Sequence, residues 1–343
     1  MQPAGEHAGI PEGVDAALLE SLCEQLLQQP LGRVSYRRLS AWKTTGSYRV
    51  HLHGRDGGRT SVIAKEARYG ADEIPALDGF PILPGAPEYA VCSAGARHPS
   101  PLLPGVYQAQ ELEPSLRYRY VFEDLVPEYS VADDVRGVAE LAPRLPSIHA
   151  SLAPLFETLD SSRLINYDAD YRAGLFSYAT DSLTAYDARF PNDAVRRVLD
   201  DMARLESGAT SVLGGAADLI GPAHGDFNTS NVMIRESGRN DLKLIDWEWA
   251  GHGLPHADLA SLVKSAAPEV QHAAVRAYAE QVPELTEERH MLLYQWCQLE
   301  RGVLDASYLA TQRRVLGESP SLDLAWCVEN SAKIIAQLFE TLR

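Results

Sequence analysis

Long apolar runs are missing from this chain of 343 residues, and no stretch approaches the length that a membrane-spanning helix needs. The first residues, Met-Gln-Pro-Ala-Gly-Glu-His, lack the basic and then apolar pattern of a signal peptide. The four cysteines show no Cys-x-x-Cys spacing, so neither a disulfide framework nor a zinc site is expected. These absences predict a reduced, cytoplasmic protein.

Positive charge is also scarce. The chain has 31 Lys and Arg against 47 Asp and Glu, and its net charge of −16 argues against nucleic acid or an anionic membrane as a partner. Residues 31–70 are the exception, with nine basic and two acidic side chains. A basic segment suits a polyphosphate, and an acidic remainder suits a cationic acceptor. A charged surface that keeps the protein in solution explains the acidic excess equally well.

The most informative stretch of the sequence is residues 221–251. Two short apolar runs, at residues 232–234 and 242–245, flank a turn-rich segment that contains Gly, Asn and Asp. Apolar runs on both sides of such a turn are typical of a β-hairpin. We therefore expect the residues just before and just after the two runs to meet at the same end of the hairpin.

Polar side chains stand at those two positions. His224-Gly225-Asp226 precedes the hairpin, Asn231 follows Asp226 by five residues, and Asp246 comes directly after the second strand. One carboxylate is then free to take a proton from a hydroxyl, while an amide oxygen and a second carboxylate can hold Mg²⁺ against the phosphates of a nucleotide. The spacing predicts phosphoryl transfer of the kinase type.

This arrangement resembles the catalytic core of the aminoglycoside phosphotransferase and choline kinase family. Those enzymes share the protein-kinase fold but have His-Gly-Asp where most protein kinases have His-Arg-Asp. The resemblance runs from about Val34 to Asp258, with its most specific motifs in the second half. It implies an α+β, two-lobed protein-kinase-like fold. A small antiparallel-sheet lobe would occupy residues 1–124, a larger and mainly helical lobe residues 125–343, and the hinge residues 123–125.

The resemblance also assigns roles to the motif residues. It implies that ATP (or GTP) and Mg²⁺ are bound, that Asn231 and Asp246 hold the metal, and that Asp226 positions the acceptor hydroxyl and receives its proton late. His224 would orient the loop by hydrogen bonding. The alternative is that Asp226 caps a turn and Asp246 ends a strand, with no chemical role for either.

The N-terminal part reads as one helix followed by three strands. Residues 14–28 have helical apolar spacing, and residues 34–39, 48–53 and 61–65 have the patterns of successive antiparallel strands. By the resemblance, Lys65 at the end of the third strand reaches the α- and β-phosphates of the nucleotide. A lone lysine at a strand end is otherwise a surface charge.

Two further segments are assigned to the nucleotide by resemblance. Residues 43–47 look like the family's short phosphate-covering turn, in which backbone N–H groups and the hydroxyl of Ser47 face the nucleotide. Residues 118–125 match the strand-to-hinge sequence that ends in Glu-Asp-Leu. Glu123 to Leu125 would therefore contact adenine through their backbone groups.

A glutamate partner for Lys65 is expected nearby. Residues 70–87 are rich in Gly, Pro and Ala and are predicted to be a loop, whereas residues 87–94 are predicted to be a helix. The resemblance places the pairing glutamate at Glu88 of this helix. Glu73 is nearer to Lys65 in the sequence and is the competing candidate.

Acidic residues of the second half are candidates for binding the acceptor. Asp168 lies in a region, residues 155–215, that varies in this family and helps to shape the acceptor pocket. Glu300 and Asp305 lie on a helix predicted for residues 291–309. These assignments rest on charge and position alone.

Other residues of the second half are expected to be structural. His149, on a helix predicted for residues 138–152 and interrupted by Pro143 and Pro146, should be a packed and hydrogen-bonded core histidine. By the resemblance, Asp258 buttresses the catalytic loop, and since it begins another helix it should also cap that helix. Glu248 either reaches a second shell around the metal or hydrogen-bonds its own loop. A last helix is predicted for residues 324–342.

The functional prediction is an ATP- and Mg²⁺-dependent O-phosphotransferase of a small hydroxylated molecule. The leading acceptor is an antibiotic, of the aminoglycoside type or another amine-bearing natural product, whose phosphorylation gives resistance or self-protection. The alternatives are a metabolic kinase for choline, an amino alcohol or a sugar, and a catalytically silent binding protein of kinase fold. The expected partners are a nucleoside triphosphate and a small molecule, with neither nucleic acid nor membrane.

Overall fold

The computed structural model describes residues 6–39, 45–69, 85–114, 116–131, 134–235, 241–264, 266–316, 328–329 and 332. Some of the sequence predictions lie outside these residues. They are most of the loop predicted for residues 70–87, which includes Glu73, the start of the turn predicted at residues 43–47, and most of the helix predicted for residues 324–342.

The N-terminal part is an antiparallel sheet of six strands in the order β1-β2-β3-β4-β6-β5. The expected strands are present, since alternating apolar side chains of β2, β3 and β4 point into one core. Because β4 lies between β3 and β6, its end is held on both sides. The bounds are β1 (His7–Ala8), β2 (Leu31–Arg38), β3 (Thr45–Gly54), β4 (Arg59–Arg68), β5 (Val106–Glu113) and β6 (Arg117–Glu123).

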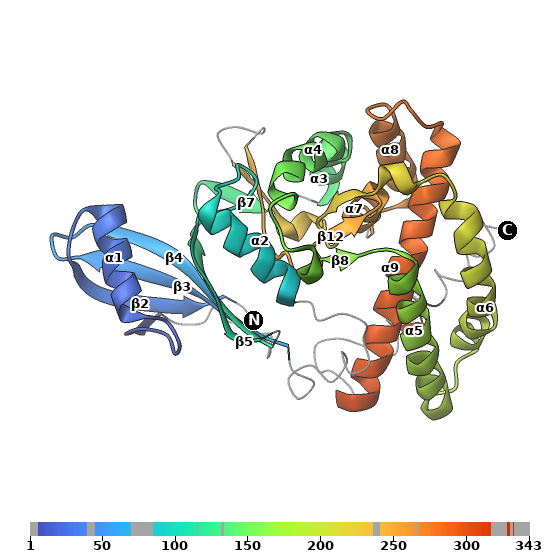
Figure 1. Cartoon of the computed structure of the whole chain (residues 1–343). Helices are drawn as coiled ribbons and strands as arrows, with labels where there is room; N and C mark the ends of the chain where they lie inside the picture. The colour runs from blue at the N-terminus through green and yellow to red at the C-terminus, as the bar shows by residue number, and fades with distance from the viewer. Residues whose placement is uncertain are drawn as a thin grey trace.

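A helix covers each side of this sheet. Helix α1 (Ala16–Leu27) begins at Asp15, whose carboxylate accepts a hydrogen bond from the N–H of Ala17, and buries Leu19 against the strands. In Figure 1, α1 lies across β2 to β4, and α2 (Gly85–Arg97) lies between the sheet and the helical part of the chain. The helix predicted for residues 87–94 is therefore present as α2.

Two prolines divide the helix that was predicted for residues 138–152. The structure has α3 (Asp134–Leu141), then a 3-10 turn at residues 142–144, then α4 (Leu145–Phe156). Proline lacks an N–H and clashes with the preceding turn, so it is tolerated best in the first turn of a helix. Pro143 lies in the 3-10 turn and Pro146 in the first turn of α4, so the interruption that the sequence predicts at these two prolines is confirmed.

The C-terminal part is mainly helical. Figure 1 shows α9 running through it with α5 alongside, and apolar side chains of these two helices form a shared core. The remaining helices are α5 (Ala169–Arg189), α6 (Asp193–Leu213), α7 (Pro255–Leu262), α8 (Pro268–Ala279) and α9 (Glu287–Leu316). None of the helices in the described ranges has both the length and the apolar character needed to cross a membrane.

Two small sheets position the motif found in the sequence. Strands β10 (Val232–Arg235) and β11 (Leu242–Leu244) pair in antiparallel fashion, so the predicted hairpin is confirmed, and β7 (Tyr129–Val131) extends it. The other sheet has the order β8-β12-β9, with β8 (Ile165–Asn166), β9 (Gly221–Ala223) and β12 (Gly251–Gly253). Residues 224–226 follow β9 directly, and residues 246–249 connect β11 to β12. The predicted α+β class, with a sheet first and helices after it, is confirmed.

Candidate active site

A cavity of about 680 Å³ is lined by both the sheet part and the helical part of the chain. Most of the residues that the sequence assigned to a site line this cavity, and they come from β3, β4, α2, the segment after β6, the hairpin and α9. They are Ser47, Lys65, Glu88, Glu123, Leu125, Asp226, Asn231, Asp246 and Asp305. Asp168, His224, Asp258 and Glu300 do not line it.

Lys65 joins the two parts of the chain at one end of the cavity. Its ammonium nitrogen Nζ lies 2.8 Å from Oε1 of Glu88 on α2 and 2.8 Å from Oδ1 of Asp246 after β11. Glu248 lies 3.3 Å from the same nitrogen and accepts a hydrogen bond of 2.7 Å from the hydroxyl of Tyr69. Glu248 therefore contacts the sheet side and does more than hydrogen-bond its own loop.

The charges of this cluster perturb one another. Burial by itself would lower the pKa of Lys65, but Asp246, Glu88 and Glu248 raise it well above its ordinary value. Attraction to Lys65 holds the pKa of Asp246 below its ordinary value, whereas burial raises the pKa of Glu88 and of Glu248. The three carboxylates offer oxygens within 4.8 Å of one another and outnumber the one ammonium.

Backbone geometry explains the glycine of His224-Gly225-Asp226. Gly225 has a φ of 78°, and a Cβ added there would collide with the backbone carbonyl of Trp249 and approach the hydroxyl of Tyr167. Tyr167 also donates a hydrogen bond of 2.6 Å to the same Trp249 carbonyl. The loop before the hairpin is thereby packed against the segment that follows Asp246.

Asp258 holds this loop by its backbone. Its carboxylate accepts hydrogen bonds of 2.8 Å from the N–H of His224 and from the N–H of Gly225, and one of 2.9 Å involves Nε2 of His149. Burial by itself raises the pKa of Asp258, but these partners outweigh it and the net pKa is below the ordinary value. The expectation that Asp258 caps its helix is wrong, because Leu254 is the N-cap residue of α7 and makes no side-chain cap.

His224 and Asn231 fix the loop from within. Nε2 of His224 lies 3.0 Å from the carbonyl oxygen of Ile245, and the ring is fully buried beside Trp247. Nδ2 of Asn231 donates to the backbone carbonyl of Asp226 at 2.9 Å and to its carboxylate at 3.1 Å. The N–H of Ile245 donates to the carbonyl of Asn231, which places Asn231 directly beside the segment that carries Asp246.

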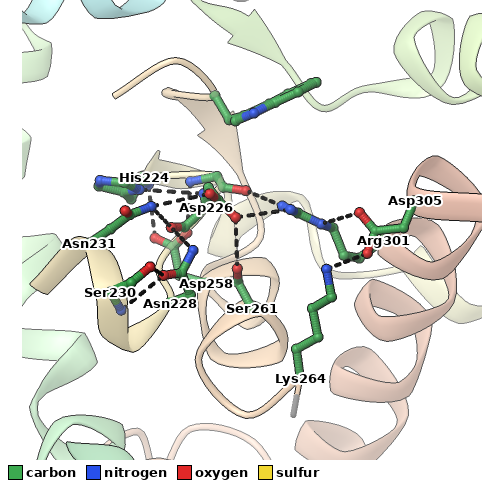
Figure 2. Close-up of polar contacts among 12 residues, drawn as sticks. His224, Asp226, Asn228, Ser230, Asn231, Asp258, Ser261, Lys264, Arg301 and Asp305 are labelled. Atoms are coloured by element: carbon green, nitrogen blue, oxygen red, sulfur yellow. Dashed lines mark hydrogen bonds and ion pairs between the residues drawn. The ribbon is translucent and has the colours of Figure 1, made fainter. Parts of the chain in front are cut away.

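Arg301 on α9 also contacts Asp226, which sequence reasoning missed. Its terminal nitrogen Nη2 lies 2.9 Å from Oδ1 of Asp226, Nη1 donates to the carbonyl of Gly225 at 3.1 Å, and Nε donates to Asp305 at 3.2 Å. Lys264 lies 2.5 Å from the other oxygen of Asp305. Figure 2 shows these side chains in a row, with Arg301 between Asp226 and Asp305.

The acidic candidates for the acceptor are not equivalent. Glu300 is buried in an ion pair of 2.5 Å with Arg172 and accepts a hydrogen bond from the indole of Trp296. Asp168 is the N-cap of α5 and accepts a hydrogen bond of 2.9 Å from the N–H of Tyr171. Asp305 lines the cavity but is paired with two cations.

Some hydrogen-bonding groups of the segment after β6 are already paired within the protein. The N–H of Glu123 donates to the carbonyl of Gly105 at 2.7 Å, and the Glu123 carboxylate accepts from the N–H of Gly105 at 2.9 Å. Asp124 forms an ion pair of 2.6 Å with Arg49 of β3. A purine bound here would have to use other backbone groups of residues 123–125 than the N–H of Glu123.

Ser47 differs from its prediction in local structure. It was expected in a turn, but β3 begins at Thr45, and Ser47 pairs with Lys65 of β4 in the antiparallel register. The side chain of Ser47 still lines the cavity because the register places it directly beside the strand end that carries Lys65.

Comparison with known proteins adds two findings. Residues 144–293, which include the loop and the hairpin, match the family model described as the phosphotransferase enzyme family. Among curated proteins, no sequence matches the chain.

Solved structures resemble the fold over nearly the whole chain. A spectinomycin phosphotransferase in complex with ADP and spectinomycin has 14% identity and a TM-score of 0.50, with 96% of this chain and 95% of that chain covered. A choline kinase from Cryptosporidium parvum has 12% identity and a TM-score of 0.56, with 96% of each covered. The GDP complex of an aminoglycoside 2'-phosphotransferase has 13% identity and a TM-score of 0.53, with 93% and 96% covered.

The family match and the structural similarity agree with the resemblance seen in the sequence, so this resemblance is confirmed. The fold is the protein-kinase-like fold of aminoglycoside phosphotransferases and choline kinases, and the family match spans the loop and hairpin that line the cavity. Residues 144–293 thus match the phosphotransferase enzyme family, and over nearly the whole chain the fold is similar to that of aminoglycoside phosphotransferases and choline kinases.

Proposed function

We propose that the protein transfers the terminal phosphoryl group of a nucleoside triphosphate to a hydroxyl of a small amine-bearing molecule. The observation that carries this proposal is the convergence of Lys65, Asp226, Asn231 and Asp246 on one cavity. Their spacing along the chain and their meeting in space agree with the arrangement that kinase-type phosphoryl transfer needs. A silent binding protein would have no need of all four groups.

The nucleotide is assigned to the sheet side of the cavity. The phosphates would lie beside Lys65, which Glu88 holds in place, and the purine would lie beside Leu125 in the segment that joins the two lobes at residues 123–125. The carbonyl of Glu123 and the N–H of Leu125 are the backbone groups assigned to the purine edge. ATP and GTP both fit this assignment, since the structural relatives include an ADP complex and a GDP complex.

The oxygen donors fit Mg²⁺. The carboxylate of Asp246 is 46% exposed, and the hairpin places Asn231 beside its segment. Hard oxygen ligands of this kind are those that Mg²⁺ uses, and substrate phosphates and water complete its shell. When bound, the ion would neutralise the charge of the phosphates. Asn231 would bind it through Oδ1, because its Nδ2 is used by Asp226.

Asp226 acts on the acceptor hydroxyl. An oxygen–phosphorus bond forms between the hydroxyl and the terminal phosphorus, the bond to the bridging oxygen of the nucleotide breaks, and the hydroxyl proton moves to the carboxylate of Asp226. Asn231 orients that carboxylate by donating to it at 3.1 Å. Since the transition state of such transfers is loose, the proton moves late and positioning dominates.

The acceptor is assigned to the α9 side of the cavity, where Asp305, Trp249 and Tyr308 line the wall. The net charge of −16 favours an amine-bearing compound, so we propose an antibiotic-type acceptor as the leading class. Choline, another amino alcohol or a sugar is the alternative. A cytoplasmic location, where nucleoside triphosphates are made, suits the free cysteines Cys23, Cys92 and Cys297.

The test is ADP release by purified protein with ATP and Mg²⁺ against a panel of acceptors. The panel holds aminoglycosides, spectinomycin, other amine-bearing antibiotics, choline, ethanolamine and simple sugars. We expect turnover on one class and its loss in Asp226→Ala with nucleotide binding retained. Asp181→Ala is the matched control, since Asp181 is exposed on α5. Turnover that survives in Asp226→Ala would refute the role given to Asp226, and a protein that binds no nucleotide would refute the function.

A further inference from the structure

The guanidinium of Arg301 lies between two carboxylates at the acceptor end of the cavity. Asp226 is 2.9 Å from Nη2, and Asp305 is 3.2 Å from Nε. Burial by itself would lower the pKa of Arg301, but Asp305 and Asp226 raise it above its ordinary value, so the group is charged throughout the working range. Lys264 pairs with the second oxygen of Asp305 at 2.5 Å. Asp305 therefore does not depend on Arg301 for neutralisation.

The position and the charge of Arg301 suit the binding of an oxyanion. Its side chain is 21% exposed and lines the same cavity as Lys65 and Asp246. Its contacts within the described residues use Nε and both terminal nitrogens, to Asp305, Gly225 and Asp226. A guanidinium has five N–H donors, so three contacts among the described residues leave donors for phosphate oxygens.

The other basic side chains of the cavity are committed elsewhere. Among the described residues, the cavity is lined by Arg49, Lys65 and Arg301. Arg49 pairs with Asp124 in the segment after β6, and Lys65 pairs with Glu88 and Asp246. Arg301 is the one of these three that contacts Asp226.

Phosphoryl transfer needs a cation at this point. The transferred group carries negative charge on its equatorial oxygens, and it must come close to Asp226, which is also negative. Two anions in a partly buried site repel each other strongly unless a cation lies beside both. Arg301 already holds one of the two anions in the geometry of Figure 2.

We propose that Arg301 is a catalytic residue that binds the transferred phosphoryl group and shields it from Asp226, as an arginine finger supplied by helix α9 of the same chain. This proposal rests on the proposed phosphoryl transfer. The backbone contact to Gly225 and the ion pair with Asp305 keep the guanidinium in place beside the phosphoryl oxygens. Its contact with Asp226 also holds that carboxylate in position for the acceptor hydroxyl.

Two other roles for Arg301 make different predictions. A residue that only positions Asp226 would affect proton transfer to Asp226 but not the binding of a phosphoryl mimic in the absence of acceptor. A residue that binds a carboxylate of the acceptor would change the KM for the acceptor and leave the nucleotide complexes unaffected. The phosphoryl role alone predicts an effect on a mimic of the transferred group when no acceptor is present.

The first experiment compares the affinity for Mg-ADP with that for Mg-ADP plus aluminium fluoride, a mimic of the transferred group, by calorimetry without acceptor. The proteins are wild type, Arg301→Ala, Arg301→Lys and the control Arg172→Ala, whose arginine pairs with Glu300 on the same helix but outside the cavity. We expect the fluoride to increase the affinity of the wild type and of the control. Arg301→Ala should lose that gain and keep its Mg-ADP affinity, which also shows that it is folded.

The second experiment measures turnover. Removal of one preorganised donor to developing charge costs on the order of 10²–10³-fold in kcat, and we expect a loss of that size in Arg301→Ala with little change in the KM for nucleotide. Added guanidinium ion should restore part of the activity of Arg301→Ala and none in Arg172→Ala. Arg301→Lys should retain intermediate activity, since it keeps the charge but loses the paired N–H groups.

The outcomes separate the inference from the proposed function. Failure of the wild type to bind Mg-ADP refutes the proposed function itself. Binding of Mg-ADP with a fluoride gain that persists in Arg301→Ala overturns the role of Arg301 and leaves the proposed function standing. The role of Arg301 is also overturned if the wild type binds Mg-ADP but aluminium fluoride does not increase its affinity. The same holds if Arg301→Ala differs from the wild type only in the KM for the acceptor.

Discussion

Lys65 and Asp246 are 181 residues apart in the sequence, yet the ammonium of one lies 2.8 Å from the carboxylate of the other. This ion pair connects the sheet to the segment after the hairpin and lies inside a group of acids that includes Glu88 and Glu248. The same lysine therefore has two tasks. It is assigned to the phosphates of the nucleotide, and it neutralises acids that would otherwise repel one another.

Replacement of Lys65 by methionine should weaken nucleotide binding and destabilise the protein. The side chain is 12% exposed, and breaking a buried pair by removing one partner costs on the order of 3–5 kcal/mol. Glu88, Asp246 and Glu248 would be left without their cation, so the loss should be largest at neutral pH and smaller in acid, where these carboxylates take up protons. Urea unfolding and Mg-ADP titration at several pH values measure both effects.

Lys243→Met is the control for that substitution, because the ammonium of Lys243 contacts the backbone carbonyl of Leu103 at 3.0 Å instead of an acid cluster. It should leave nucleotide affinity unchanged. Equal nucleotide affinity in Lys65→Met and wild type would move the phosphate contact to another residue. A destabilisation that does not depend on pH would show that the acids are not the cause.

Substitution of Gly225 by alanine should stop turnover. The left-handed φ of 78° costs a non-glycine residue about 1–2 kcal/mol, and the new Cβ would also collide with the carbonyl of Trp249. The loop must move to relieve that collision. Displacement by about 1 Å of a group such as Asp226 costs on the order of 10²-fold in rate. Steady-state kinetics and thermal unfolding of Gly225→Ala test this.

Gly57→Ala separates the two causes. Gly57 has a φ of 91° but nothing lies within 4 Å of the added Cβ, so only the cost of the backbone conformation of about 1–2 kcal/mol applies. We expect Gly57→Ala to lower the Tm and to keep full activity. Comparable activity in the two variants would mean that the contact of the loop with Trp249 does not position Asp226.

Asp258→Asn should lower kcat while nucleotide affinity is retained. The asparagine would present an amide group where the N–H groups of His224 and Gly225 now donate to the carboxylate, each at 2.8 Å. A buried N–H left without an acceptor costs about 1–3 kcal/mol, so the loop should loosen and stability should fall by about that amount. Kinetics, nucleotide titration and urea unfolding give the three values.

Glu269→Gln is the matched control for Asp258→Asn, because Glu269 is an exposed acid in the first turn of α8. It should change stability by a few tenths of a kcal/mol at most, through the helix dipole. A similar small effect in Asp258→Asn would contradict the role of its hydrogen bonds to the loop.

Predictions that concern a single hairpin or a single strand could be made from the spacing of residues in the sequence. Asn231 and Asp246 flank two short strands whose pairing the turn sequence indicates, so their approach could be derived from residues 226–246 alone. The interruption of the helix predicted for residues 138–152 is equally local, since Pro143 and Pro146 mark it in the sequence. The roles given to the cavity residues stay predictions.

Tertiary packing decides the rest. Arg301 follows Glu300 in the sequence, and neighbouring positions of a helix face directions about 100° apart. Which one faces the cavity depends on how α9 packs against α5, and no feature of the sequence specifies that rotation. The packing turns Glu300 towards Arg172 and Arg301 towards Asp226. The i, i+4 spacing of Arg301 and Asp305 indicated only an ordinary ion pair on a helix.

A pair of buried histidines should make the protein sensitive to acid. Nε2 of His256 lies 3.0 Å from Nδ1 of His290, whose Nε2 lies 2.9 Å from the carbonyl of Val282. Burial, together with His290, His149 and Arg289, lowers the pKa of His256 from 6.5 to about 3. The unfolded chain therefore binds a proton at this residue below about pH 6.5, whereas the folded protein does not.

The sign of the effect follows from that difference. The contribution of His256 to the free energy of unfolding is complete above pH 6.5 and is lost as the pH falls towards about 3. The slope is at most about 1.4 kcal/mol per pH unit within that range. His256→Gln keeps a donor for His290 but cannot be protonated, so its stability should fall less steeply with acid. His272→Gln, at an exposed position on α8, should follow the wild type. Parallel curves for His256→Gln and wild type in urea unfolding would assign the acid sensitivity to other groups.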